Sequence, residues 1–355
     1  MINLDDLKQI KQLDKSHVLG SVEALPLQCQ HAWEEANKVV VPNDYQNIDA
    51  LVMTGMGGSG LGARLTESIY GPDLRVPLVR VNDYGLPGFV NEQTLVVCSS
   101  YSGSTEETIS NAQQAINRKA KWLAVATGGQ LLAMARQAGV PYYQIQPTYN
   151  PSNQPRMAIG YSVISQLVLA HKCGVINLSE KELVAAIETM RQLQKNLKVE
   201  VPQAQNPAKQ LAKKVYHKIL VYVAGCHLTG AMHTIKNQLN ENAKTFAAGF
   251  DIPELNHHLM EGLKHPLTNQ QDLFFFIAQS DLYPERIKKR VVLTQDVVQQ
   301  QGIETFLWQP QSQSKLSQAF ELIQFGAYVN FYLSMLYGID PAPIPWVDYF
   351  KKKLK

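Results

Sequence analysis

The sequence predicts an α/β protein built from two doubly wound parallel-sheet domains that follow an N-terminal helical segment. Short apolar runs of strand length alternate with longer helix-like stretches from residue 51 onward. This alternation stops at a polar stretch and then starts again. Each half also opens with a strand, a glycine-containing turn and a helix. Short buried strands that alternate with helices indicate parallel sheets covered on both faces.

The first half of the chain is expected to hold a helical segment and a five-stranded domain. Residues 1–44 carry apolar residues at mixed three- and four-residue spacing, which favours helices. Residues 45–178 are assigned to the first sheet domain, which a long helix near residues 157–171 closes. The apolar runs predicted to be its strands are Leu51–Thr54, Pro77–Val81, Leu95–Cys98, Trp122–Ala126 and Tyr142–Ile145.

The second half is expected to repeat this arrangement after a connector. Residues 179–206 are polar and helix-prone, and residues 207–355 are assigned to a second domain that ends in a C-terminal helix. Because the strand-to-helix turns at residues 53–60 and 222–230 resemble each other, the two domains are predicted to be similar. The strands predicted in this half are Ile219–Val223, Leu273–Ala278 and Ile303–Trp308.

Composition narrows the class of protein. The 355 residues are 45% hydrophobic, which suits two globular cores, and the net charge is only +3, from 33 basic and 30 acidic residues. This balance gives no reason to expect a nucleic acid or an anionic membrane as a partner. The N-terminus lacks a signal-peptide pattern, no apolar stretch is long enough to span a bilayer, and the four cysteines lack metal-ligand spacing. We expect a cytoplasmic protein with reduced thiols, no metal and no cofactor.

The loop after the first predicted strand, residues 55–60 (Gly-Met-Gly-Gly-Ser-Gly), is a candidate anion site. Its glycines let the backbone approach an anion, and the following helix start supplies free N–H groups, so Gly57, Gly58 and Ser59 become candidate phosphate contacts. A tight turn without a ligand would explain the glycines equally well. The loop also fits G-x-G-x-x-G, and Asp83 lies near the end of the second strand, so a dinucleotide site is a further alternative.

The loop after the third predicted strand, residues 99–107, carries four serines and a threonine at a helix start. Hydroxyls and free N–H groups together suit a phosphate dianion, so Ser100, Ser102 and Thr105 are candidate phosphate contacts. The alternative is helix capping by a Ser104–Glu107 capping box. Capping needs only one hydroxyl, and a dinucleotide fold has no use for this loop on its third strand. The two loops therefore favour a monophosphate held between them.

With these loops in place, the chain resembles the sugar isomerase (SIS) fold, which is flavodoxin-like, and specifically the bifunctional phosphoglucose/phosphomannose isomerase family. The motifs occur in the family's order over nearly the whole chain from Leu51. They are residues 55–60, 100–107, 155–161 (Pro-Arg-Met-Ala-Ile-Gly-Tyr), 253–258 (Pro-Glu-Leu-Asn-His-His) and 340–343 (Asp-Pro-Ala-Pro). The resemblance implies reversible conversion of glucose 6-phosphate, and of mannose 6-phosphate, into fructose 6-phosphate.

The resemblance also implies a base and a fixed positive charge. An aldose–ketose isomerase moves a proton between C1 and C2 and stabilises the enediolate between them. Glu241 resembles the family's catalytic base, and Glu254 is the rival carboxylate. Arg156 resembles the arginine that stabilises the enediolate, since a guanidinium stays charged and can meet two oxygens at once. Without the family, a lysine-paired surface glutamate and an inter-domain salt bridge would be the ordinary interpretations of Glu241 and Arg156.

Two further groups are implied for opening the sugar ring. His257, in the 253–258 motif, matches the family's ring-opening histidine. An imidazole suits this role because it titrates near neutral pH and can move the proton of the ring oxygen. His258 is adjacent, and the family has a different polar residue there. Lys351 matches a lysine expected beside the ring oxygen, although Lys352 and Lys353 leave its register open.

The resemblance finally implies a homodimer whose active sites lie at the subunit interface, with His257 reaching the site of the other subunit. The partners expected are therefore hexose phosphates and a second copy of the chain. Ala342 stands where the family commonly has threonine, which puts the mannose 6-phosphate activity in question. The alternative function is a non-catalytic protein that binds sugar phosphates on the same fold.

Overall fold

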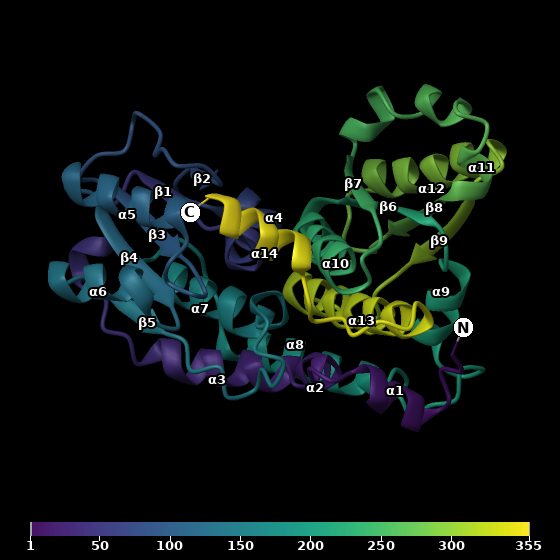
Figure 1. The fold of residues 1–355 in the computed structure, drawn as a ribbon. Coiled ribbons are helices and arrows are strands. Elements are labelled where there is room, and N and C mark those ends of the chain that lie inside the picture. Colours follow the sequence, from purple (N-terminus) through teal and green to yellow (C-terminus); the bar gives the residue numbers. More distant parts are fainter. Residues whose placement is uncertain (1, 355) are drawn as a thin grey trace.

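The computed structural model describes residues 2–354 and shows two parallel sheets flanked by helices (Figure 1). The first sheet has the strand order β2-β1-β3-β4-β5, and the second has the order β7-β6-β8-β9. The first four strands of each half thus follow the same order, which confirms two similar doubly wound domains. The strands are β1 Ala50–Thr54, β2 Leu78–Val81, β3 Thr94–Ser99, β4 Lys121–Ala126, β5 Tyr142–Gln144, β6 Ile219–Gly225, β7 Ala247–Ile252, β8 Leu273–Ala278 and β9 Glu304–Trp308.

The helices lie on both faces of each sheet and between the sheets. The α-helices are α1 Leu7–Leu13, α2 Val18–Glu23, α3 Leu25–Asn37, α4 Leu61–Tyr70, α5 Glu106–Asn117, α6 Gly129–Ala138, α7 Ile159–Lys172, α8 Glu180–Gln194, α9 Pro207–Lys214, α10 Thr229–Asn242, α11 Asn269–Asp272, α12 Glu285–Gln300, α13 Lys315–Leu336 and α14 Pro345–Leu354. Short 3-10 turns are η1 Asn43–Gln46, η2 Gly57–Gly60, η3 Gly71–Asp73, η4 Pro155–Met157, η5 Cys226–Leu228, η6 Glu254–His257 and η7 Glu261–Lys264.

The first sheet buries both of its faces, which explains why its strands read as continuous apolar runs. Side chains alternate along a strand, so Leu51 and Met53 join one hydrophobic cluster while Val52 joins the other. The first cluster includes residues of α3 and α7, and the second includes residues of α5 and α6. The strands are thus fixed in register, and their carboxyl ends meet at one edge.

The two halves share one continuous core. The larger hydrophobic cluster contains residues of both sheets together with the long helix α13. All but the first residue of α13 is buried, so this helix is covered on every side. Helix α8, in the segment expected to connect the halves, packs against α3 and α13. Figure 1 shows α13 below the second sheet, and this helix begins beside the first half and ends near the start of β6.

One strand, β7, was missed from the sequence. It forms the edge of the second sheet and pairs only with β6 among the described strands. Only its end residues Ala247 and Ile252 are buried, and Gly249 and Asp251, which are two positions apart on one face, are exposed. A glycine and a carboxylate both weaken a strand signal, and an edge position tolerates them.

Within residues 2–354, none of the helices combines the length and the apolar character that crossing a bilayer requires. Three of the cysteines are buried and Cys226 is exposed. We found no group of three or more histidine, cysteine, aspartate or glutamate side chains among these residues that could hold a metal ion.

Candidate active site

The first candidate phosphate loop lies between β1 and α4 and includes the turn η2. Gly57 has a φ of +51°, a left-handed conformation in which a side chain would strain the backbone. Ser59 is buried, and its Oγ accepts a hydrogen bond of 2.8 Å from the backbone N–H of Tyr101. Ser59 therefore ties the first loop to the second rather than simply facing solvent.

The second candidate loop lies between β3 and α5. The Ser100 Oγ lies 2.8 Å from the Thr105 Oγ1 and accepts the N–H of Gly103 at 3.1 Å. Ser102 is exposed, and its Oγ accepts the N–H of Ser104. Three candidate hydroxyls thus lie in the short loop between β3 and α5, at the carboxyl edge of the first sheet.

Helix capping does not explain these hydroxyls. The residue at the N-cap of α5 is Thr105, not Ser104, and its side chain makes no capping hydrogen bond. The Ser104–Glu107 capping box is therefore absent, and the first N–H groups of this 12-residue helix have no hydroxyl bound to them. Free N–H groups at a helix start are well suited to a phosphate anion.

Arg156 lies beside the first loop. It belongs to the turn η4, and a Cβ placed on Gly58 would lie 3.1 Å from the Pro155 carbonyl oxygen and 3.4 Å from the Arg156 Cα. The Ser162 Oγ, from α7, donates to the Gly58 carbonyl at 3.0 Å. The glycine thus lets the loop pack directly against the backbone that carries the arginine.

The Arg156 guanidinium is anchored by the protein, and its side chain is only 3% exposed. Its Nε donates to the Asn242 Oδ1 at 2.6 Å, and its Nη1 donates to the Gln154 Oε1 at 3.0 Å. Its Nη2 donates to the carbonyl oxygens of Pro341 and Ala342 at 2.9 and 2.6 Å. These bonds use four of the five N–H groups of a guanidinium. The expected contact with two substrate oxygens at once is therefore not available in this arrangement, because one N–H remains.

The remaining N–H belongs to the Nη1, which lies next to Glu241. The Glu241 Oε2 lies 3.7 Å from the Arg156 Nη1, and the Glu241 side chain is 33% exposed. Burial raises the pKa of Glu241, and the charges of Arg156, Lys244 and Lys351 act in the opposite direction. A carboxylate with a raised pKa next to a fixed cation is suited to accept a proton from carbon and to return it.

Lys244 is a site residue that sequence reasoning missed. It follows α10, and its Nζ donates to the carbonyl oxygens of Glu241 at 2.6 Å and of Pro341 at 2.7 Å. Burial and the nearby Arg156 lower its pKa to about 8. The only signal in the sequence was its place three residues after Glu241, which is also a common spacing for surface charges.

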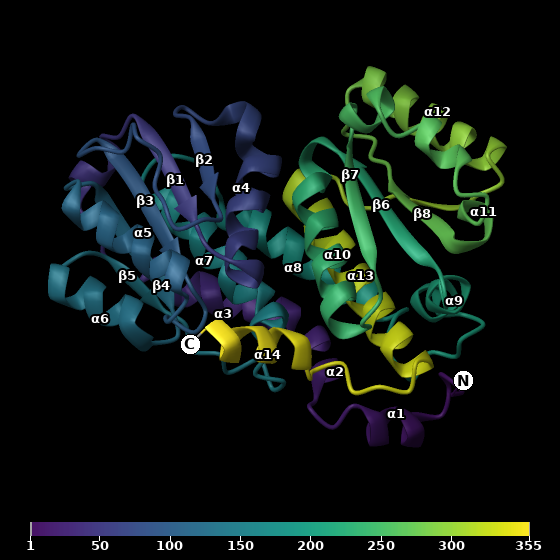
Figure 2. The same cartoon turned by 45° about the horizontal axis from the view of Figure 1, so that its top comes forward.

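Lys351 lies on α14, which runs back toward the first sheet and ends beside it (Figure 2). Lys351 is one of the three cations whose charge lowers the pKa of Glu241, so its side chain is near the carboxylate. The neighbouring Lys353 instead places its Nζ 5.9 Å from the ring centroid of Tyr349. The structure therefore favours Lys351 over Lys353 as the lysine of this site.

In the folded chain, His257 lies away from Glu241 and Arg156. The start of β7 is beside the end of α10, because the Asn240 Oδ1 accepts the N–H of Ala247. His257 follows the far end of β7, which is about 17 Å long for six residues. The structure thus brings Glu241, Arg156 and Lys351 together and leaves His257 apart from them.

The rival groups near His257 form a pair of their own. The Glu254 Oε2 lies 2.8 Å from the His258 Nε2, and both side chains are exposed. Glu254 and His257 both belong to η6, so Glu254 also lies beyond the far end of β7. Asp83, the carboxylate of the dinucleotide alternative, accepts the N–H of its neighbour Tyr84.

Comparisons with known proteins identify the family of this chain. The family model described as the bacterial phospho-glucose isomerase C-terminal SIS domain matches residues 204–354. A bifunctional phosphoglucose/phosphomannose isomerase of Caldicellulosiruptor bescii is 34% identical, over 94% of this chain and 98% of that protein. The Aquifex aeolicus protein of the same name is 30% identical, over 92% and 95%. The crystal structure of a hypothetical protein of Thermus thermophilus, TT0462, has a TM-score of 0.75 at 15% identity, covering 98% of this chain and 92% of that one. This chain therefore belongs to the bifunctional phosphoglucose/phosphomannose isomerase family.

Proposed function

We propose that this chain interconverts fructose 6-phosphate with glucose 6-phosphate and with mannose 6-phosphate. Two relatives at 30% identity or more carry this bifunctional name and align over nearly the whole chain. The observation that carries the chemistry is the approach of the Glu241 carboxylate to the Arg156 guanidinium, 3.7 Å apart, beside the Gly57–Gly60 loop. A sugar-phosphate sensor without catalysis would not require a carboxylate with a raised pKa at this place.

In the proposed reaction the two loops hold the phosphate of the open-chain sugar. Gly57, Gly58 and Ser59 belong to the first loop, and Ser100, Ser102 and Thr105 belong to the second. With the phosphate fixed, C1 and C2 would lie near Glu241. The carboxylate takes the proton from C2 of the aldose, and the C2–H electron pair forms the C1=C2 bond of the enediolate while the carbonyl pair moves onto O1. A proton passes from O2 to O1, and the Glu241 carboxylic acid returns its proton to C1 as the carbonyl forms at C2. No electron is gained or lost overall, so side chains alone can supply the chemistry.

Positive charge around Glu241 would stabilise the enediolate. The Arg156 Nη1, which carries the one N–H of this side chain without a hydrogen bond among the described residues, lies 3.7 Å from the Glu241 carboxylate, and Lys244 and Lys351 add two more charges nearby. Fixed charges act strongly in a partly buried site because little solvent has to reorganise. Anchoring Arg156 through four bonds keeps its charge in place during the reaction.

Ring opening is assigned to His257 of a second copy of the chain. Within one chain His257 lies beyond the far end of β7, about 17 Å of strand away from the Glu241 end. A second copy could place its own η6 turn beside Glu241, and Lys351 would then lie next to the ring oxygen. The proposed active site is thus completed by a homodimer.

The test is a coupled assay of the purified protein with fructose 6-phosphate, with EDTA present and no cofactor added. Formation of both glucose 6-phosphate and mannose 6-phosphate is expected. Formation of glucose 6-phosphate alone would contradict the bifunctional part of the proposal. Binding of fructose 6-phosphate without turnover would instead identify a sugar-phosphate-binding protein.

A further inference from the structure

The acceptors that hold the Arg156 guanidinium are all uncharged. Its Nε donates to the Asn242 amide oxygen at 2.6 Å, and its Nη1 donates to the Gln154 amide oxygen at 3.0 Å. Its Nη2 donates to two backbone carbonyl oxygens. Among residues 2–354, Glu241 carries the only carboxylate within 4.0 Å, and at 3.7 Å it is beyond hydrogen-bond distance. Neutral dipoles therefore orient this guanidinium, and none of its bonds goes to a negative charge.

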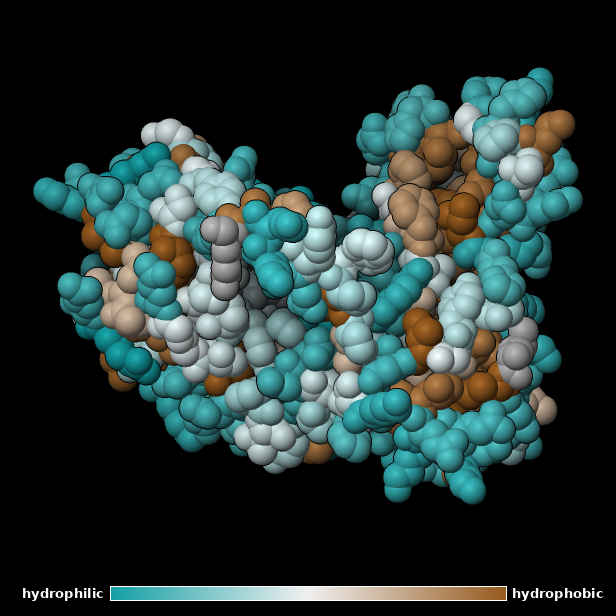
Figure 3. All heavy atoms as spheres, in the orientation of Figure 1, coloured by the Kyte–Doolittle hydropathy of each residue, from teal (hydrophilic) through white to brown (hydrophobic). Residues whose placement is uncertain are grey.

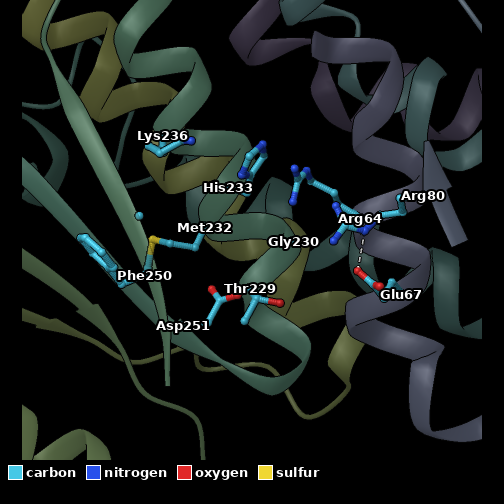
Figure 4. Close-up of a pocket in the computed structure, with 11 residues that line it drawn as sticks. Arg64, Glu67, Arg80, Thr229, Gly230, Met232, His233, Lys236, Phe250 and Asp251 are labelled. Carbon is cyan, nitrogen blue, oxygen red and sulfur yellow. Dashed lines mark ion pairs between the residues drawn. The ribbon is translucent and has the colours of Figure 1, made fainter. Parts of the chain in front are cut away.

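A buried arginine ordinarily pairs with a carboxylate. Arg80 has such a partner in a polar cavity of about 320 Å³, where its Nε lies 2.6 Å from the Glu67 Oε2 (Figure 4). Other hydrophilic side chains lie at the surface in contact with solvent, as Figure 3 shows for one face of the molecule. Arg156 is only 3% exposed. Asp340 and Asp348 also act on its charge, but neither lies within 4.0 Å of its nitrogens.

Helix α10 holds Arg156 with two buried amides on one face. Asn242, directly after Glu241, is the last residue of the helix, and Gln238 lies four residues earlier. The Gln238 Nε2 donates to the Arg156 backbone carbonyl at 3.0 Å, while Asn242 holds the side chain. Because the Asn242 Oδ1 faces the guanidinium, its Nδ2 is left with the Met157 sulfur at 3.4 Å, which is a weak acceptor.

An aspartate would satisfy this position better by hydrogen bonding alone. It has the same shape, presents two acceptor oxygens and has no donor to leave with a sulfur atom. It would also form a direct ion pair with Arg156, so the cation would stabilise a developing enediolate less. A negative charge one residue from Glu241 would raise the pKa of that carboxyl group further. Burial already raises this pKa, and the charges of Arg156, Lys244 and Lys351 oppose the effect.

We propose that Asn242 and Gln154 are positioning residues that orient Arg156 through uncharged oxygens and so keep its whole positive charge available to the enediolate. Both act through Arg156 and not on the sugar itself. The proposal deepens the proposed function and rests on it, because the enediolate is the anion that this charge stabilises. Charge, and not only hydrogen bonding, then decides which side chain is active at position 242.

The test changes the charge at position 242 and keeps the shape. Asn242→Asp retains an oxygen for the Arg156 Nε, yet kcat for fructose 6-phosphate should fall at least about 10-fold. The acid limb of the kcat/KM profile should move up by about one pH unit. Gln154→Glu makes the same change at the second acceptor and should move the limb in the same direction. The matched control is Asn196→Asp, at an exposed position after α8, which should change neither quantity.

A further variant separates charge from packing. Asn242→Ala removes the acceptor and adds no charge, so kcat should fall while the acid limb stays at its wild-type pH. Equal shifts of the limb in Asn242→Ala and Asn242→Asp, or wild-type kinetics in Asn242→Asp, would overturn the proposal.

Two outcomes remain to be distinguished. Gln154 is only partly buried, so Gln154→Glu tests the charge even if Asn242→Asp does not fold. In that case an unshifted limb in Gln154→Glu would overturn the proposal. Absence of turnover in the wild-type protein would contradict the proposed function and the role of Asn242 together, whereas an active enzyme that tolerates both carboxylates would contradict only the latter.

Discussion

The Oε2 of Glu241 lies 3.7 Å from the Nη1 of Arg156, although 85 positions separate the two residues in the sequence. Arg156 comes from the turn η4 of the first half and Glu241 from the last turn of α10 in the second half. The contact therefore depends on the packing of α10 against α4 of the first half. It joins the proposed base to the cation that we propose stabilises the enediolate.

Replacing Glu241 by glutamine should abolish proton transfer while leaving substrate binding intact. Removing a general base lowers turnover by roughly 10²- to 10⁴-fold, and the phosphate loops are unchanged. The coupled assay gives kcat, and calorimetry gives the affinity for fructose 6-phosphate. The comparison is Glu254→Gln, the rival carboxylate, which within one chain pairs with His258 beyond the far end of β7. Equal losses of kcat in the two variants would contradict the assignment of the base.

The pH dependence of kcat/KM should have two limbs. Because burial raises the pKa of Glu241 above its ordinary value, the acid-side fall in activity should lie at higher pH than for an ordinary glutamate. The pKa of Lys244 is lowered to about 8, so its charge beside the site is lost as the pH rises through 8. Lys244→Met should be less active throughout and should lack the alkaline fall near pH 8. An unchanged alkaline limb in Lys244→Met would assign that limb to another group.

The lowered pKa of Lys244 also predicts how the free energy of unfolding changes with pH. Its ordinary pKa is 10.5 and its folded pKa is about 8, so between these values the unfolded chain binds more protons than the folded one. The contribution of Lys244 to the free energy of unfolding therefore rises with pH across this window. Urea unfolding of wild type and Lys244→Met at pH 7.5 and 9.5 measures it as a difference between the two proteins. A difference that does not vary with pH would contradict the shift.

Removing the Ser100 hydroxyl should weaken substrate binding more than turnover. Ser100 is buried and positions both Thr105 and the N–H of Gly103, so Ser100→Ala loosens the loop proposed to hold the phosphate. We expect KM for fructose 6-phosphate to rise about 10-fold, which corresponds to roughly 1.4 kcal/mol, with little change in kcat. Ser104→Ala, in the same loop but exposed, is the control and should keep the wild-type KM.

Two inactive variants should restore each other if the site is shared between copies. Glu241→Gln and His257→Gln are each expected to be nearly inactive. After unfolding and refolding together in equal amounts, half of the dimers would be mixed, and each mixed dimer would hold one intact site. The mixture should therefore recover about one quarter of the wild-type activity. Recovery of none would place both residues of each site in one chain.

Ala342 allows a test of the choice between epimers. Its carbonyl oxygen accepts from Arg156 at 2.6 Å, so the residue lies beside the proposed sugar site. Ala342→Thr adds a hydroxyl at a buried position and should change the ratio of mannose 6-phosphate to glucose 6-phosphate formed. A hydrogen bond to one sugar hydroxyl is worth a few-fold to about 100-fold in selectivity. An unchanged ratio would show that this position does not discriminate between the two configurations at C2.

Much of the fold was predictable because burial of both sheet faces leaves a clear pattern. Eight of the nine strands in the described part of the chain coincide with apolar runs, since both of their faces require apolar side chains. The ninth, β7, was missed because an edge strand needs only one apolar face and tolerates Gly249 and Asp251. The positions of the two candidate phosphate loops were predictable for a related reason, since each loop directly follows one of these buried strands.

The sequence by itself determined the two doubly wound domains, the two loops at the carboxyl edge of the first sheet and, through its ordered motifs, the family. Only the tertiary structure decided which charges meet. It bound four N–H groups of Arg156 to protein acceptors, brought Lys244 and Lys351 to Glu241, and put His257 beyond the far end of β7. The physical reason is that a periodic pattern reports which side chains are buried, whereas an electrostatic site depends on distances between elements that are far apart in the chain.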